Sequence, residues 1–294
     1  MLASAAIGLA LAGLLAQPAA ADWRDRIGTF RVGVVAGERL LAVTRRMQPF
    51  ATVLSDALDM PVEIIALPDG RALIDAQIGG RVEYAIHSAS AFAAAWVLCK
   101  CVEPIAVPRD ADGALGFSAV VLARAGGPGS ASQLAGRAVV VPGAEAFVTR
   151  LTRFLLGERG IAMDGFRLTV AADGTDAAMR FAAGEGAALI GWEPADAGRA
   201  PTRGTATLLA ERGVRDHKTI WRSPVVPYGA HAVRTGLSGE AKLLIWEALQ
   251  GLRETDRDAY EAAAPLQEGG FVQATRADYA PVIAMVRKQL EAGD

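Results

Sequence analysis

Four turns in the chain carry side chains or backbone N–H groups that could hold an anion. Each follows a predicted strand or precedes a predicted helix, and ligands of open α/β sheets bind at such places. Unpaired N–H groups and the dipole of a helix N-terminus favour negative charge there. The candidate residues in these turns are Glu38, Arg39, Ser88, Ser90, Ala144, Glu145, Thr175 and Asp176. Simple helix capping, for which Ser88 and Thr175 are well suited, is the alternative interpretation.

Two aromatic residues are further candidates for contact with a ligand. Trp192 follows a buried strand predicted at 187–190, and its ring could stack on a ligand or hold a cation, or cover the sheet edge. Tyr228 follows the extended segment 217–221 and the proline-containing segment after it. His231 lies in an alternating apolar run, which indicates a half-buried strand histidine rather than a ligand contact.

Cys99 and Cys101 are separated by a single residue. In an oxidising compartment two thiols this close could form a local disulfide, and as thiolates they could bind a soft metal such as Cu(I). The pair lacks the four-ligand spacing of a zinc site. Because the segment lies between a helix end and an apolar strand, a disulfide or an inert pair is the favoured interpretation.

Sequence signatures of catalysis are scarce. The segment 116–120 fails the Gly-x-Ser-x-Gly pattern at Val120, and the glycine-rich loop at 125–130 lacks the Lys-Ser/Thr of a phosphate-binding loop. The three histidines, at positions 87, 217 and 231, form no recognisable metal pair. No nucleophile–base pair, cofactor motif or metal site is predicted, so the chain is expected not to be an enzyme.

Short apolar strands alternate with amphipathic helices along most of the chain. Such alternation is typical of parallel crossover units, in which helices cover both faces of a sheet. Strands are predicted at 30–35, 61–67, 82–86, 117–123, 137–141, 166–171, 187–190, 217–221 and 229–233, and helices at 40–58, 71–78, 88–97, 144–156, 175–183, 239–252, 256–263 and 276–290.

Two α/β series in tandem, followed by a helical tail, predict two lobes. If the tail returns to the first lobe, the chain crosses between the lobes twice, and a double crossing makes a hinge that can close around a ligand. The predicted division is 22–115 plus 225–294 for lobe 1, and 116–224 for lobe 2.

The N-terminal segment predicts export. Residues 1–21 carry no charge, and the apolar run at 7–16 is shorter than the ~20 residues that span a bilayer. Small residues at 19–21 precede Asp22, as in a cleavable signal peptide, although the usual basic start is missing. An uncleaved membrane anchor is the alternative. The mature protein is expected in the periplasm, as a monomer.

The composition disfavours a bulk electrostatic partner. The chain has 294 residues, 52% of them hydrophobic, and its 30 Lys+Arg against 32 Asp+Glu give a formal charge of −2. A nearly neutral chain is not expected to bind nucleic acid or an anionic membrane surface.

Several motifs together resemble a known family. They are Pro49-Phe50, Pro61-Val62-Glu63, Asp69, the segments 80–85 and 113–124, Trp221–Gly229, and Gly269–Val272 followed by Asp278-Tyr279. In order and spacing, over about residues 28–290, the chain resembles the periplasmic solute-binding proteins of the phosphate/phosphite/phosphonate ABC-transporter family. The resemblance implies a type II periplasmic-binding fold of two α/β lobes, a small-molecule ligand in the interlobe cleft, and delivery to a membrane permease.

The chain departs from that family at two turns. Phosphonate binders of the family carry a Ser/Thr-rich turn where this chain has Gly143-Ala144-Glu145, and commonly histidine at the position of Asp176. Two like charges about 5 Å apart repel by roughly 3 kcal/mol at an effective dielectric of about 20, more than the ~0.3–1 kcal/mol of a helix dipole. Unless these acids point away or pair with Arg39 or Arg150, phosphate-like dianions should bind poorly. A cationic ligand or a metal complex is then as plausible as an oxyanion.

The sequence therefore predicts the exported solute-binding component of an ABC transporter, which captures a small polar ligand by hinge closure. One alternative is a sensory component that docks on a signalling receptor. Another is an enzyme on the same fold that uses Glu145 and Asp176 as acid and base.

Overall fold

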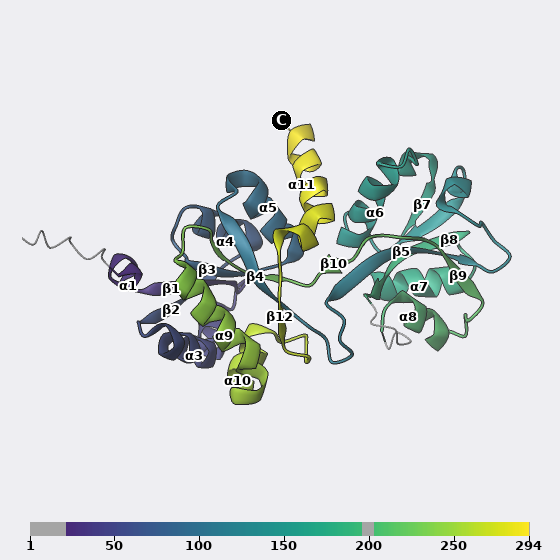
Figure 1. The fold of residues 1–294 in the computed structure, drawn as a ribbon. Helices are drawn as coiled ribbons and strands as arrows, with labels where there is room; N and C mark the ends of the chain where they lie inside the picture. Colours follow the sequence, from purple (N-terminus) through teal and green to yellow (C-terminus); the bar gives the residue numbers. More distant parts are fainter. Residues whose placement is uncertain (1–21, 196–202, 294) are drawn as a thin grey trace, which may run out of the picture.

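The computed structural model describes residues 22–195 and 203–293, which form two α/β lobes side by side (Figure 1). The predicted signal peptide at 1–21 lies outside the described residues. We call the body built on the first sheet lobe 1 and the body built on the second sheet lobe 2. None of the helices in the described ranges combines the length and apolar character needed to cross a bilayer.

The sheet of lobe 1 has six strands in the order β12-β4-β11-β3-β1-β2. Their bounds are β1 Phe30–Val35, β2 Val62–Leu67, β3 Tyr84–His87, β4 Val102–Pro108, β11 Ala230–Arg234 and β12 Phe271–Gln273. Strand β1 runs parallel to β2 and β3, whereas β11 is antiparallel to β3 and β4, and β12 is antiparallel to β4. The middle of this sheet is therefore completed by a strand that the chain makes only after it has built lobe 2.

The sheet of lobe 2 also has six strands, five of them in the order β10-β5-β8-β6-β7, with β9 paired to β5. Their bounds are β5 Gly116–Arg124, β6 Ala138–Val141, β7 Arg167–Val170, β8 Ala188–Pro194, β9 His217–Arg222 and β10 Val226–Pro227. Strand β6 is parallel to β7 and β8, and β5 is antiparallel to β8, β9 and β10. Both sheets are thus mixed, not purely parallel.

Helices cover both faces of each sheet. Lobe 1 carries α1 Trp23–Ile27, α2 Leu40–Arg46, α3 Gln48–Leu58, α4 Gly70–Ile78, α5 Ala89–Cys99, α9 Gly239–Thr255, α10 Arg257–Ala263, the short η3 Arg276–Tyr279 and α11 Ala280–Ala292. Lobe 2 carries η1 Ala131–Leu134, α6 Phe147–Gly157, η2 Met163–Gly165, α7 Gly174–Ala182 and α8 Thr205–Glu211. The side chains of consecutive strand residues point to opposite faces. Tyr84 and Ala85 accordingly belong to different buried clusters.

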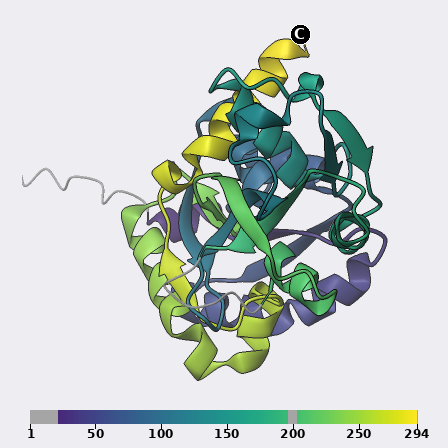
Figure 2. The ribbon, with the colours of Figure 1, turned by 90° about the vertical axis from the view of Figure 1, so that its right-hand side faces the viewer.

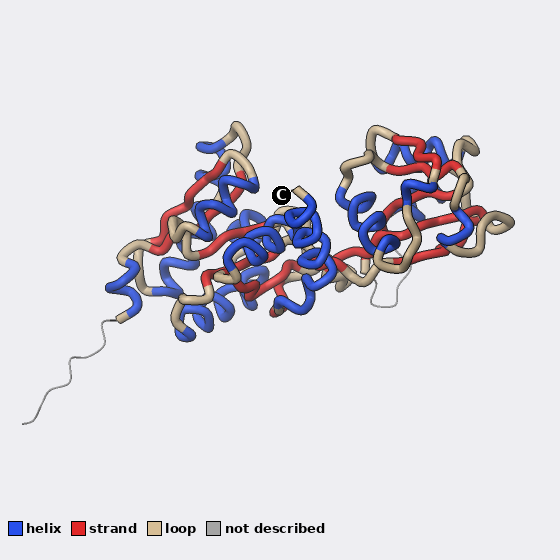
Figure 3. The backbone as a smooth tube through the Cα atoms, turned by 90° about the horizontal axis from the view of Figure 1, so that it is seen from above, coloured by secondary structure: helices blue, strands red, loops and turns tan. Residues whose placement is uncertain are grey.

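The two crossings between the lobes run side by side, as extended segments that join the two bodies (Figure 3). Strand β10 pairs with the start of β5, Val226 opposite Phe117 and Pro227 opposite Gly116. A Cβ atom on Gly116 would lie 2.0 Å from the carbonyl oxygen of Val226, so the close approach requires glycine. The Tyr228 N–H donates to the Leu115 carbonyl at 3.0 Å. The crossings therefore form one hydrogen-bonded ribbon.

The C-terminal helix α11 contacts both lobes. It packs along α5 of lobe 1 and also touches α6 of lobe 2, and it stands beside both in the two ribbon views (Figures 1 and 2). The Phe92 ring of α5 and the Tyr279 ring just before α11 have centroids 4.7 Å apart. The Lys288 ammonium lies 2.9 Å from the Glu158 carboxylate at the end of α6. The tail is thus a second contact between the lobes, apart from the ribbon.

The structure corrects the predicted elements in three places. The helix expected over 40–58 is divided at Met47, because Pro49 lies in the first turn of α3 and has no N–H to continue the ladder from α2. Helix α8 was not predicted, and neither were the short strands β10 and β12, which have no periodicity of their own. The strands at 217–221 and 229–233 were predicted, but their antiparallel pairing, as β9 with β5 and as β11 with β3 and β4, was not.

Candidate functional site

A cavity of about 480 Å³ lies between the lobes. Both lobes and the second crossing contribute to it: Ser88, Ser90 and Leu266 from lobe 1, Phe117, Phe147 and Arg150 from lobe 2, and Tyr228 from the crossing. A cavity of this volume holds a small organic molecule. Because its walls come from two separately folded sheets, its width depends on how the lobes are placed.

On the lobe 1 side the cavity is bounded by the N-terminus of α5. Strand β3 ends at His87, and the Ser88 hydroxyl caps α5 by accepting a hydrogen bond from the Ala91 N–H at 3.2 Å. The hydroxyls of Ser88 and Ser90 are 3.2 Å apart. Hydroxyl donors at the positive end of an eleven-residue helix are suited to an anionic group.

On the lobe 2 side the cavity is bounded by the first turn of α6. Phe147 is the first residue of this helix, and Arg150 lies one turn further on. Arg150 Nε is buried and has no hydrogen-bond partner among the described residues. No Asp or Glu lines the cavity, and Arg150 is its one permanently charged residue among those the structure describes. An unpaired buried guanidinium nitrogen is costly, so this group is poised to bind an acceptor.

Three aromatic rings of lobe 2 pack edge to face beside the cavity. The Phe117 ring lies 5.9 Å from the Phe147 ring at an interplanar angle of 77°, and 6.2 Å from the Trp192 ring at 75°. Phe117 and Phe147 line the cavity, whereas Trp192 does not. Such tilted pairs are a favoured aromatic geometry and hold each ring in one orientation.

Two buried histidines of lobe 1 lie close to the cavity and are neutral. His231 lines it, is 1% exposed, and shares a hydrogen bond of 2.5 Å from Nδ1 to the Tyr84 hydroxyl. Burial lowers the pKa of His231 to about 3 and that of His87 to about 4. His87 Nε2 is 2.8 Å from Gln77 Oε1, and the Gln77 amide donates to the Ala232 carbonyl at 2.9 Å. These side chains fix the end of β3 and add no charge.

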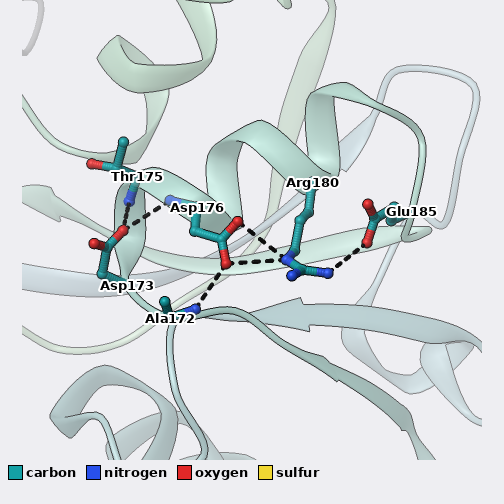
Figure 4. A network of polar contacts seen from close by, with 6 residues as sticks. All are labelled: Ala172, Asp173, Thr175, Asp176, Arg180 and Glu185. Atoms are coloured by element: carbon teal, nitrogen blue, oxygen red, sulfur yellow. Dashed lines mark hydrogen bonds and ion pairs between the residues drawn. The ribbon is translucent and has the colours of Figure 1, made fainter.

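The carboxylate of Asp176 is held by its own helix, α7 (Figure 4). It accepts from the Ala172 N–H at 2.8 Å and from Arg180 Nε at 3.1 Å. The Ala172 N–H, and after it Arg180, lower the pKa of Asp176 below its usual value. Asp173 caps the same helix by accepting from the N–H groups of Thr175 and Asp176, both at 2.8 Å. The first turn of α7 therefore satisfies its own polar groups.

Two further carboxylates near the crossings are paired with arginine. Glu193, near the end of β8, forms an ion pair with Arg222. Asp110, in the first crossing, pairs with Arg203 of lobe 2 and accepts from the Tyr228 hydroxyl, and Arg203 also donates to that hydroxyl at 2.8 Å. These acids are neutralised locally, so the cavity retains the positive character of Arg150.

The structure brings only some of the predicted residues together. Ser88, Ser90 and Tyr228 line the cavity. Those that do not line it are Glu38 and Arg39 in the exposed turn before α2, Ala144 and Glu145 in the turn before α6, Thr175 and Asp176 in α7, and Trp192 in β8.

Sequence reasoning missed the apolar lining residues Phe117, Phe147 and Leu266, because apolar residue types carry no chemical signal of a site. It considered Arg150 only as a partner for the acids. His231 was interpreted as a strand residue, and it is one, since it lies in β11, but its ring also lines the cavity.

The two cysteines form a disulfide at the end of α5, with Cα atoms 5.0 Å apart. This end of the helix is the one opposite Ser88. Within residues 22–195 and 203–293, no group of three or more His, Cys, Asp or Glu side chains is arranged to hold a metal ion.

Known structures share this two-lobed fold. XAC2383 from Xanthomonas citri bound to ATP matches with a TM-score of 0.61 and 14% identity, over 91% of this chain and 100% of that one. PhnD1 from Prochlorococcus marinus (MIT 9301) in complex with methylphosphonate matches with a TM-score of 0.52 and 13% identity, over 90% of this chain and 99% of that one. At such identities the likeness shows the fold alone.

Sequence comparison gives the family. A search of curated protein sequences finds no match. The family model for the phosphonate ABC transporter periplasmic substrate-binding protein matches residues 32–279. That range begins within β1 and includes both crossings and η3, and so takes in both lobes and every residue named above as lining the cavity. The chain therefore belongs to the family of periplasmic substrate-binding proteins of phosphonate ABC transporters, as its motifs predict.

Proposed function

We propose that the protein captures a small organic anion of the phosphonate class in the cavity between its lobes and delivers it to a membrane permease. The family supplies the transport role, and its members are extracytoplasmic binding components. Residues 1–21 would then be a cleaved signal peptide, and the mature protein would act as a periplasmic monomer.

One observation carries the choice of an anion. Arg150, whose Nε is buried without a partner among the described residues, lines a cavity that no described carboxylate lines and that Ser88 and Ser90 of α5 line from the other lobe. Arg150 would repel a cationic ligand, because no described acidic residue lines the cavity to offset its charge. The argument against phosphate-like anions depended on Glu145 and Asp176. Neither lines the cavity, and Asp176 pairs with Arg180. The methylphosphonate bound by PhnD1 is an anion of this class.

We propose closure about the ribbon of the two crossings as the binding motion. The rigid units would be residues 22–115 with 225–294, and residues 116–224, which meet where β5 and β10 pair. Closure brings Ser88 of lobe 1 towards Arg150 of lobe 2, so one anion can contact both. Closure of hinged lobes around a ligand is a known motion of two-lobed binding proteins.

We propose binding without turnover. The acid–base pair that an enzyme on this fold would need is not supported, because the Asp176 carboxylate is engaged by the Ala172 N–H and by Arg180. Glu145 lies in an exposed turn and does not line the cavity.

A ligand screen with matched arginine variants tests the proposal. Methylphosphonate at a hundredfold excess over its dissociation constant should stabilise the protein by about 2.7 kcal/mol, whereas a simple amine or a divalent metal should not. Arg150→Gln should weaken binding about 10–100-fold, the value of a hydrogen bond to a charged group. Arg153→Gln, on the same helix but not lining the cavity, should leave it unchanged. Binding of amines but not of phosphonates, phosphate or sulfonates would refute the proposal.

A further inference from the structure

The cavity is largely apolar, and its apolar residues come from both lobes. Phe117 and Phe147 line it from lobe 2, and Pro265 and Leu266 line it from the loop between α10 and β12 of lobe 1. Leu266 is 77% exposed, a large value for a leucine in a folded protein. When the lobes close, these side chains need an apolar partner between them.

The two phenylalanines form a fixed wall. Phe117 is held edge-on by Phe147, with ring centroids 5.9 Å apart, and by Trp192, at 6.2 Å. Such packing leaves little freedom for a ring to turn away from the cavity. A ligand that consists only of a charged head group would leave this wall facing water.

Few of the side chains that line the cavity are polar. Arg150 supplies one cation, and Ser88 and Ser90 supply hydroxyls at the N-terminus of α5. The Tyr228 hydroxyl already bonds to Asp110 and Arg203. The other polar side chains of the lining are the neutral His231 ring and the uncharged amide of Gln267, so the described lining offers no second charged group to a ligand.

We infer that the ligand is an amphipathic anion: one phosphonate or sulfonate group bound by Arg150 and α5, carrying an alkyl or aryl substituent that packs between Phe147 and Leu266. This inference rests on the proposed function and narrows its ligand class. Phosphonate and sulfonate share the tetrahedral, charged head group, so the test includes both.

A series of ligands that differ only in alkyl chain length tests whether the apolar residues of the cavity bind the substituent. Affinities of methyl-, ethyl-, propyl- and butylphosphonate, and of the matching sulfonates, are measured by titration calorimetry on the mature protein. Each added methylene buries more apolar surface, so affinity should rise about fourfold per carbon, which is the factor that corresponds to ~0.8 kcal/mol. The series with the steeper rise and tighter binding identifies the head group.

Two variants and one control test whether the rise in affinity with chain length comes from the apolar residues that line the cavity. Phe147→Ala and Leu266→Ala should each flatten the dependence on chain length while methylphosphonate binding changes little. Leu266→Ala removes an exposed side chain, so the test stands even if Phe147→Ala fails to fold. Leu243→Ala, a 55% exposed leucine of α9 that does not line the cavity, should behave like the unaltered protein.

The possible outcomes separate this inference from the function it rests on. If butylphosphonate and methylphosphonate bind equally tightly, the apolar ligand class is refuted and anion capture stands. If butylamine binds more tightly than either butyl anion, the assignment of Arg150 to the head group is refuted. If no phosphonate or sulfonate of any length binds, the proposed function itself fails.

Discussion

The carboxylate of Asp110 in the first crossing forms an ion pair with the guanidinium of Arg203 in lobe 2, and the Tyr228 hydroxyl of the second crossing donates to the same carboxylate. Asp110 is only 5% exposed. One buried acid thus connects both crossings with the second lobe. It lies at the place about which the lobes would turn, so we expect it to set how freely they do so.

Removing this carboxylate should loosen the hinge. We expect Asp110→Asn to lower the free energy of unfolding by about 1–3 kcal/mol, because Arg203 and Tyr228 lose a charged acceptor. X-ray scattering of the unliganded variant should show a broader distribution of interlobe distances. Asp112→Asn is the matched control, since the one hydrogen bond that the Asp112 carboxylate accepts from the described residues comes from the Ala114 N–H in the same turn, at 3.1 Å. Equal effects of the two variants would contradict this role for Asp110.

A variant of Asp176 tests whether its carboxylate repels an anionic ligand from the cavity. If its carboxylate repelled the ligand, Asp176→Asn would raise phosphonate affinity about a hundredfold, the factor for ~3 kcal/mol. Because Asp176 is bound by the Ala172 N–H and Arg180 and does not line the cavity, we expect a change of less than about twofold, within the ordinary scatter of distant sites. Calorimetric titration with methylphosphonate measures it.

The buried histidines should make the protein sensitive to mild acid. The pKa values of His87, about 4, and His231, about 3, lie below the 6.5 of the unfolded chain, so the unfolded state binds more protons between these limits. Their contribution to stability is complete above pH 6.5 and is lost progressively as the pH falls towards 4. At pH 5 we expect a loss of about 2 kcal/mol for each histidine.

Denaturant unfolding at pH 8, 7 and 5 measures this dependence. Stability should be level between pH 8 and 7 and fall between 7 and 5, and His87→Asn should remove about half of the fall. A stability that stays level down to pH 5 would contradict the burial of neutral imidazoles.

The Cys99–Cys101 disulfide should be structural and remote from ligand binding. It closes a very short loop, so the double variant Cys99→Ser with Cys101→Ser should lose only about 2 kcal/mol of stability on the chain-entropy model. It lies at the end of α5 opposite Ser88, so phosphonate affinity should be unchanged. Thiol titration of the unfolded, unreduced protein should find no free thiol. Two free thiols, or one equivalent of Cu(I) that stays bound through purification, would instead support the metal-binding interpretation.

The parts of the fold that depend on local pattern were predicted from the sequence. The strands at 30–35 and 137–141 and the helices that follow them carry their own periodicity, and Ser88 and Ser90 were found because they lie between a strand and a helix. The pairing of Asp176 with Arg180 was not predicted, although it has a local signal, since residues four apart are neighbours on a helix surface.

The remaining features depend on residues distant in sequence. The Glu193–Arg222 and Asp110–Arg203 pairs join residues from different segments, so nothing in the spacing of either pair reveals it. The apolar wall could not be distinguished from core, because Phe117 and Phe147 begin a strand and a helix in the manner of ordinary core residues. Only the arrangement of two sheets turns them into a ligand surface.

The place of β11 between β3 and β4 sets an order on how the protein can assemble. The second sheet is built from the continuous stretch Gly116–Pro227, so all of its strands are available once that stretch has emerged from the ribosome. The first sheet cannot close until Arg234 has followed, and until then the strands of its N-terminal part have unpaired edges. In a nascent polypeptide with such an interrupted sheet, the first lobe stays incompletely folded until β11 has been made.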